Sequence, residues 1–147
     1  MKKITPWLPA LLWMALIFAM SAAPGEVSGE QSGRLLELLI AVYGFFFGDT
    51  HLPPQALYTL ETLLRKAAHM SEYAVLALLY AHALRQNGAK RPLRYALLLC
   101  VCYAATDELH QAFVPDRGPA LFDVGVDTAG AYIGLALLRL YNRIRRR

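Results

Sequence analysis

Charged residues are scarce in this chain, and cysteines are scarcer still. Asp, Glu, Lys and Arg make up 18% of the 147 residues, whereas a soluble domain usually carries about a quarter. The two cysteines, Cys100 and Cys102, would point to nearly opposite faces of a helix, which disfavours a shared metal. One such pair does not suggest a disulfide framework either. Internal repeats and low-complexity tracts are also lacking, which disfavours a repeat architecture.

Long apolar blocks dominate what is present, and 56% of the residues are hydrophobic. Each block has about the 20 residues that a helix needs to cross the hydrocarbon core of a bilayer. Each is apolar on every face, which is typical of a membrane span. The sequence therefore predicts one all-α, polytopic membrane domain over residues 1–147. Its four transmembrane helices are expected at residues 7–23, 67–84, 95–114 and 121–141.

The first block also has features of a cleavable signal peptide, because Lys2 and Lys3 precede the apolar run and small residues follow it. The run is longer than a usual signal core, and Pro24 comes just after the best cleavage point. We therefore expect this block to be retained as a helix.

The basic residues indicate how the helices are oriented. Eleven of the fifteen Lys and Arg fall at the start of the chain, between the second and third blocks, and at the end. Four helices place these three segments on one side, and short basic segments stay in the cytoplasm. Both termini are therefore expected to be cytoplasmic. The net charge of +4 comes mainly from these basic segments. We expect them to hold the topology and to contact lipid headgroups rather than to bind nucleic acid.

Residues 34–48 form a shorter and more broken apolar stretch. We expect either an amphipathic helix at the outer interface or a re-entrant segment there. The stretch DTHLPPQ that follows is expected to be a loop, and a helix that begins near Ala56 is expected to continue into the second span.

Polar side chains gather at the outer ends of all four predicted spans. On the second span, Arg65, His69, Glu72 and Tyr73 share one helical face. The other spans contribute further groups: Asp107, Glu108, His110, Gln111, Asp123, Asp127 and Ser21. Ionisable groups within spans are costly, face the bundle interior or a water-filled cavity, and mark function. We therefore predict a functional site that faces outward near the outer leaflet.

The residue types at this site suit acid–base chemistry. The candidate catalytic residues are His69, Glu72, Asp107 and Glu108. Partial burial beside other carboxylates favours a protonated acid, and a histidine, His69 or His110, can accept a proton near neutral pH. The remaining residues are assigned to binding: Ser21, Lys66, Tyr73, His110, Gln111, Arg117, Asp123 and Asp127.

Alternatives to catalysis stay open. Arg117 and Lys66 can hold an anionic group such as a phosphate, or they can simply neutralise buried acids. Metal and cofactor are left unassigned, because the ligand types suit a divalent cation but no contiguous metal motif is present. A cleft of this kind suits a non-catalytic binder equally well. A proton conduit is disfavoured because the inner halves of the helices are apolar.

Two stretches, KAAHMSEYAVLALL and YAATDELHQAFVPDRGPALFDVGVDTAGAYIG, closely resemble the VanZ-like family of bacterial membrane proteins. FAMSAAPGEVSGEQS resembles the end of that family's first helix. The matching positions are Lys66, His69, Glu72 or Tyr73, Asp107, Glu108, Gln111, Pro115, Arg117, Asp123, Asp127, Gly130 and Gly134. The chain departs from the family pattern at Ala22, where a second Ser is frequent, at Asp116, where Gly is common, and at Asp127, where Asn is frequent.

The resemblance implies a multi-pass protein of the bacterial cytoplasmic membrane. The family's founding member is linked with resistance to the glycopeptide teicoplanin, and glycopeptides act on wall precursors outside the membrane. The resemblance therefore implies action on cell-envelope or lipid-linked precursors. The expected partners are the lipid bilayer and such a precursor.

Overall fold

The computed structural model describes residues 3–48, 51–118 and 120–146, and no strand occurs among them. The elements in chain order are a short 3-10 helix η1 (Thr5–Trp7), α1 (Leu8–Ser21), α2 (Gly25–Phe47), α3 (Pro54–Gln86), α4 (Pro92–Gln111) and α5 (Leu121–Ile144). The all-α prediction is confirmed.

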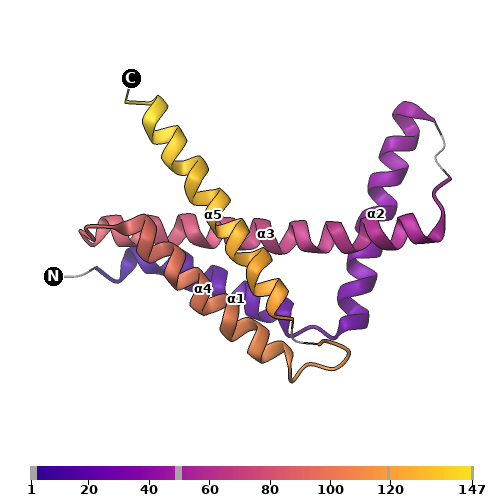
Figure 1. Cartoon of the computed structure of the whole chain (residues 1–147), viewed down its shortest axis with the longest axis horizontal. Coiled ribbons are helices and arrows are strands. Elements are labelled where there is room, and N and C mark those ends of the chain that lie inside the picture. Colours follow the sequence, from indigo (N-terminus) through magenta and orange to yellow (C-terminus); the bar gives the residue numbers. More distant parts are fainter. Residues whose placement is uncertain (1–2, 49–50, 119, 147) are drawn as a thin grey trace.

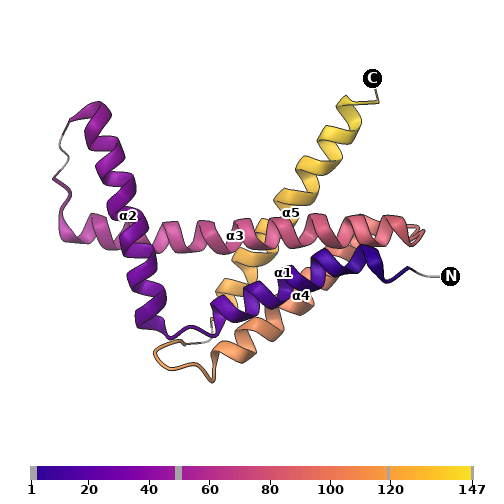
Figure 2. The same ribbon diagram turned by 180° about the vertical axis from the view of Figure 1, so that it is seen from behind.

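Helix α3 is the central element of the molecule. It runs along the long axis in Figures 1 and 2, and η1, α1, α2, α4 and α5 all contact it. Its 33 residues correspond to a length of roughly 50 Å. The helix begins at Pro54, in the first turn where proline is tolerated. It ends before Gly88, whose φ of +72° suits glycine at a helix end. The prediction of one continuous helix from near Ala56 through residues 67–84 is therefore confirmed.

Helix α5 crosses α3 at close range through two glycines. A Cβ at Gly130 would overlap the backbone of Met70, and one at Gly134 would lie 2.8 Å from the carbonyl oxygen of Ala74. Small residues let helices approach in this way. Gly125, five residues before Gly130, has nothing within 4 Å of such a Cβ among the described residues. The close approach of α3 and α5 is thus made by Gly130 and Gly134.

The chain turns sharply after α1. The N-terminal helical segment and α2 are inclined at 103° to each other, because Pro24 interrupts the helix with an extended backbone at ψ 151°. Helix α2 begins at Gly25, well before the helix expected from residue 34. Gly25 packs so closely that a Cβ there would overlap the carbonyl of Asp116.

Length and composition identify one clear membrane-span candidate, α5, among the described residues. The η1–α1 segment and α2 meet the same criterion only as a bent pair. Helices α3 and α4 fall short, since charged residues such as Glu72, Asp107 and Glu108 interrupt their apolar sequence. The four-span arrangement therefore stays a prediction.

The basic segments lie together at one end of the bundle. Lys3 N donates a hydrogen bond to Asn87 Oδ1 at 2.7 Å, and Asn87 Nδ2 donates to Lys3 O at 3.1 Å. Near this α3–α4 turn, Arg85 lines a surface cavity together with Arg139 and Arg143 of α5. Lys2 and Arg147, which the sequence assigns to the same side, lie outside the described residues.

Candidate functional site

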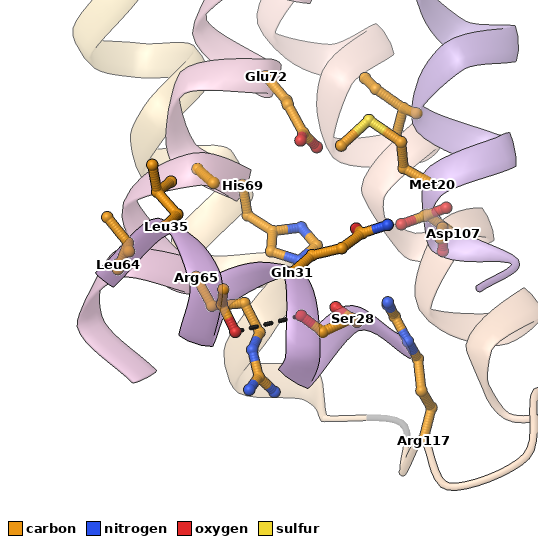
Figure 3. Close-up of a pocket in the computed structure, with 14 residues that line it drawn as sticks. Met20, Ser28, Gln31, Leu35, Leu64, Arg65, His69, Glu72, Asp107 and Arg117 are labelled. Atoms are coloured by element: carbon orange, nitrogen blue, oxygen red, sulfur yellow. Dashed lines mark hydrogen bonds between the residues drawn. The ribbon is translucent and has the colours of Figure 1, made fainter. Parts of the chain in front are cut away.

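A cavity of about 190 Å³ lies where α1, α2 and α3 meet the end of α4 and the loop before α5. Figure 3 shows the side chains that line it. One wall is apolar, with Ile17, Met20, Leu35 and Leu64. The polar lining consists of Ser21, Ser28, Gln31, Ser32, Arg65, His69, Glu72, Asp107 and Arg117. The cavity therefore combines cations, carboxylates and an apolar surface.

Helix α3 presents Arg65, His69 and Glu72 to this cavity, whereas Tyr73, predicted on the same face, does not line it. Arg65, His69 and Glu72 follow each other at helical spacing, and the His69 ring lies in the middle of the view in Figure 3. Behind His69, its Nδ1 lies 3.9 Å from Oδ1 of Asp127, a carboxylate on α5 that is only 2% exposed. That oxygen has no hydrogen-bond partner among the described residues, and Asp127 lies behind His69 without lining the cavity itself.

Asp107 reaches the cavity from α4. The residue is 2% exposed, and its Oδ2 accepts a hydrogen bond of 3.1 Å from Gln111 Nε2, one turn further along the helix. Its Oδ1 has no hydrogen-bond partner among the described residues. Gln111 therefore fixes one carboxylate oxygen and leaves the other available to a ligand.

Two arginines approach from different elements. Arg65 Nη2 lies 3.2 Å from Glu61 Oε1, and the Arg65 Nε is buried without a partner in the described structure. Arg117 extends from the loop toward Asp107 (Figure 3), yet no described carboxylate lies within 4.0 Å of its guanidinium. Burial lowers the pKa of Arg117, and the negative charge of Asp107 opposes that shift. The guanidinium stays charged, as arginine does in proteins.

The end of α1 is anchored so that Ser21 reaches this site. The indole nitrogen of Trp13 donates to the carbonyl of Glu72 at 2.9 Å, and the Tyr103 hydroxyl donates to the carbonyl of Met14 at 2.6 Å. Ser21 is buried at the last turn of α1, and its hydroxyl has no partner among the described residues.

Three predicted residues hold the start of α5 instead of lining the cavity. Glu108 Oε2 accepts a hydrogen bond of 2.9 Å from the backbone N–H of Ala120, immediately before the helix. Lys66 Nζ pairs with Asp123 Oδ1 at 2.5 Å and lies 4.8 Å from the centre of the Phe122 ring. These contacts fix the loop that carries Arg117.

Two further predicted residues also lie outside the cavity lining. Tyr73 is fully buried in the bundle core, and its hydroxyl has no partner among the described residues. Its ring lies 6.1 Å from that of Tyr103. His110 stacks on Phe18 with ring centres 4.3 Å apart, which joins α4 to the end of α1.

Sequence reasoning missed the contribution of α2 and gave no role to Arg65. Ser28, Gln31 and Ser32 line the cavity, and Ser32 Oγ donates to Glu61 Oε1 at 2.8 Å. The sequence feature that indicates this contribution is the four-residue spacing of Ser28 and Ser32, which places both side chains on one face of a helix. Arg65 was recognised on the same face as His69, but Lys66 was assigned to anion binding in its place.

The residue types that line the cavity are suited to an anion and to proton exchange. Guanidinium groups provide paired donors that match phosphate or carboxylate, and an imidazole such as that of His69 is a common acid–base group. No group of three or more His, Cys, Asp or Glu side chains in the described ranges is placed to hold a metal ion.

No curated protein and no solved structure matches the chain significantly. The model of the VanZ/LLP1 family matches residues 6–142. This range includes every candidate site residue named above. The chain therefore belongs to the VanZ/LLP1 family, as the motifs on its helices imply.

Proposed function

We propose that this protein acts on a phosphate-bearing, lipid-linked precursor of the cell envelope at the outer leaflet of the bacterial cytoplasmic membrane. One observation carries the proposal: Arg65 and Arg117 converge with His69, Glu72 and Asp107 on a cavity that also has an apolar wall. Arginine suits phosphate recognition because its planar fork donates paired hydrogen bonds. The apolar wall suits the start of a lipid chain.

Unpaired polar atoms support a polar ligand at this place. Ser21 Oγ, Arg65 Nε and Asp107 Oδ1 are all buried without a hydrogen-bond partner among the described residues, although buried polar groups are normally paired. The volume of about 190 Å³ is below the roughly 300 Å³ of the smallest typical drug-sized sites. The cavity therefore fits a phosphate headgroup rather than a whole glycan.

The proposed catalytic role rests on three side chains. His69 exchanges the proton, with Asp127 lying 3.9 Å behind it, while either Glu72 or Asp107 provides the second acid–base group. Glu108 serves the site indirectly in this proposal, because its carboxylate holds the backbone at Ala120.

Membrane placement follows from the positions of the charges. We propose that η1–α1, α3, α4 and α5 span the bilayer with the basic end in the cytoplasm. Large apolar side chains such as Leu12, Leu98 and Leu137 are exposed on three of these helices, as lipid contact requires. Helix α3, at roughly 50 Å, exceeds the ~30 Å hydrocarbon core. Its first half and α2 then lie at the outer surface beside the cavity.

Mass spectrometry of wall precursors in cells tests this function. Cells would carry the wild-type protein, Glu72→Gln, or the exposed control Glu37→Gln. An active enzyme produces a precursor species that is present with wild type and Glu37→Gln and missing with Glu72→Gln. Identical precursor pools in all cells, including cells that lack the protein, would contradict a wall-modifying enzyme. A teicoplanin susceptibility assay on the same strains tests the link to resistance.

A non-catalytic binder is the second candidate, favoured by the apolar wall of Ile17, Met20, Leu35 and Leu64, which contributes affinity but no chemistry. The two functions differ in how they respond to substitution. A catalyst loses its cellular effect completely in either Glu72→Gln or His69→Asn. A binder declines in steps as Arg65, Arg117 and the apolar contacts are removed one by one.

A further inference from the structure

A second cavity lies at the other end of the bundle, between α4 and α5. It measures about 420 Å³, and its apolar lining includes Leu97, Leu135 and Leu140. Arg94, Arg139 and Arg143 line the same cavity. An adjoining cavity of about 510 Å³ shares Arg139 and Arg143 and adds Arg85 and Arg146. Together they form one groove, here called the α4–α5 groove, with an apolar part and an arginine-rich part.

The positive charge of this groove is not balanced within the molecule. None of its five arginines has a carboxylate within 4.0 Å in the described ranges. The sequence contains no Asp or Glu from Tyr73 to Thr106, and none after Asp127. All five arginines are exposed, and clusters of exposed arginine at a membrane surface attract anionic lipid headgroups. An anion that pairs with them has to come from outside the described chain.

We propose that the α4–α5 groove binds one anionic phospholipid. The arginines hold its phosphate, and an acyl chain lies along Leu97, Leu135 and Leu140. A soluble phosphate would leave this apolar wall uncovered, whereas a phospholipid covers both parts. The groove also lies near the C-terminal end of α5, the helix whose length and composition suit a membrane span. Basic pockets between helices at a membrane surface typically bind such headgroups.

Native mass spectrometry of the full chain in detergent tests the assignment. Dioleoyl phosphatidylglycerol is titrated against dioleoyl phosphatidylcholine on the wild type, on Arg139→Gln/Arg143→Gln and on Arg91→Gln/Arg145→Gln. The last variant removes the same charge from residues that do not line the groove. We expect phosphatidylglycerol to bind the groove variant about 10- to 30-fold more weakly than the wild type, and the control variant to bind like the wild type.

A second substitution separates the groove from net charge. Ala136 is exposed and lines the cavity. Ala136→Trp fills the cavity with a bulky side chain and removes no charge, so it should also reduce phosphatidylglycerol binding. Equal weakening in both double variants, equal binding of the two lipids to the wild type, or unchanged binding in Ala136→Trp would overturn the proposal. Repeating the titration with Arg65→Gln/Arg117→Gln should leave the groove affinity unchanged, which distinguishes this site from the outer cavity.

Discussion

At the scale of single residues, the loop that carries Arg117 contains one strained backbone position. Asp116 has a φ of +57°, the only positive value at a non-glycine residue in the described ranges. The left-handed region costs an L-residue roughly 1–2 kcal/mol, a cost that glycine would not carry. The strain lies next to Arg117 and beside the start of α2, where Gly25 N donates to Pro115 O at 3.2 Å.

We therefore expect Asp116→Gly to stabilise the protein. Relief of the left-handed strain outweighs the entropy that glycine loses on folding, so the free energy of unfolding should rise by about 0.5–1 kcal/mol. Thermal unfolding in detergent, followed by circular dichroism, measures this. The matched control is Gly88→Ala, which places a Cβ at a φ of +72° and should lower the Tm. A lower Tm for Asp116→Gly would show that its side chain contributes more than the strain costs.

At the scale of elements, the contact between α3 and α5 is set by the absence of side chains at two positions. Gly130→Ala forces a Cβ into the backbone of Met70, and over-packing of this kind costs about 1–3 kcal/mol. Gly125→Ala meets open space, so helix propensity alone should stabilise it by up to about 1 kcal/mol. Thermal unfolding of the two variants should show a lower Tm for Gly130→Ala and a higher Tm for Gly125→Ala. Changes of the same sign would contradict the close contact between α3 and α5 at Gly130.

The N-terminus of α5 depends on Glu108. Replacing it with Ala leaves the N–H of Ala120 without its acceptor, and the loss of such a cap costs about 1–2 kcal/mol. Glu108→Gln keeps an acceptor oxygen, so it should unfold close to the wild-type Tm and retain function. A complete loss of function in a normally folded Glu108→Gln protein would instead assign Glu108 to the chemistry.

The sequence predicted the elements with long apolar blocks better than the others. α3, α4 and α5 were expected close to where they lie, and the phase of Arg65, His69 and Glu72 was correct because helical spacing fixes it. The start of helix α2 could not be predicted, since Gly25, Gly29 and Gly33 have low helix propensity and indicate a loop. Likewise, the pairing of Lys66 with Asp123 depends on how α3 and α5 cross, which local sequence does not specify.

At the scale of the whole molecule, the account requires the two ends to face opposite sides of the membrane. Two single-cysteine variants, Lys90→Cys and Gly118→Cys, each in a Cys100→Ala/Cys102→Ser background, report the side of the membrane on which each end lies. Both positions are exposed, and a Cβ at Gly118 meets nothing within 4 Å among the described residues. A membrane-impermeant maleimide should label Gly118→Cys in intact cells and Lys90→Cys only after lysis. Labelling in the reverse order would invert the topology.

The most direct test of the central claim is to identify the lipid that accompanies the protein out of the membrane. The wild type, Arg65→Gln/Arg117→Gln and Arg139→Gln/Arg143→Gln would be purified gently and their bound lipids identified by mass spectrometry. The account predicts a phosphate-bearing, lipid-linked envelope precursor on the wild type and on the second variant, and its loss from the first. Retention of that precursor by Arg65→Gln/Arg117→Gln, or no such precursor on any of the three, would contradict the assignment of the outer cavity.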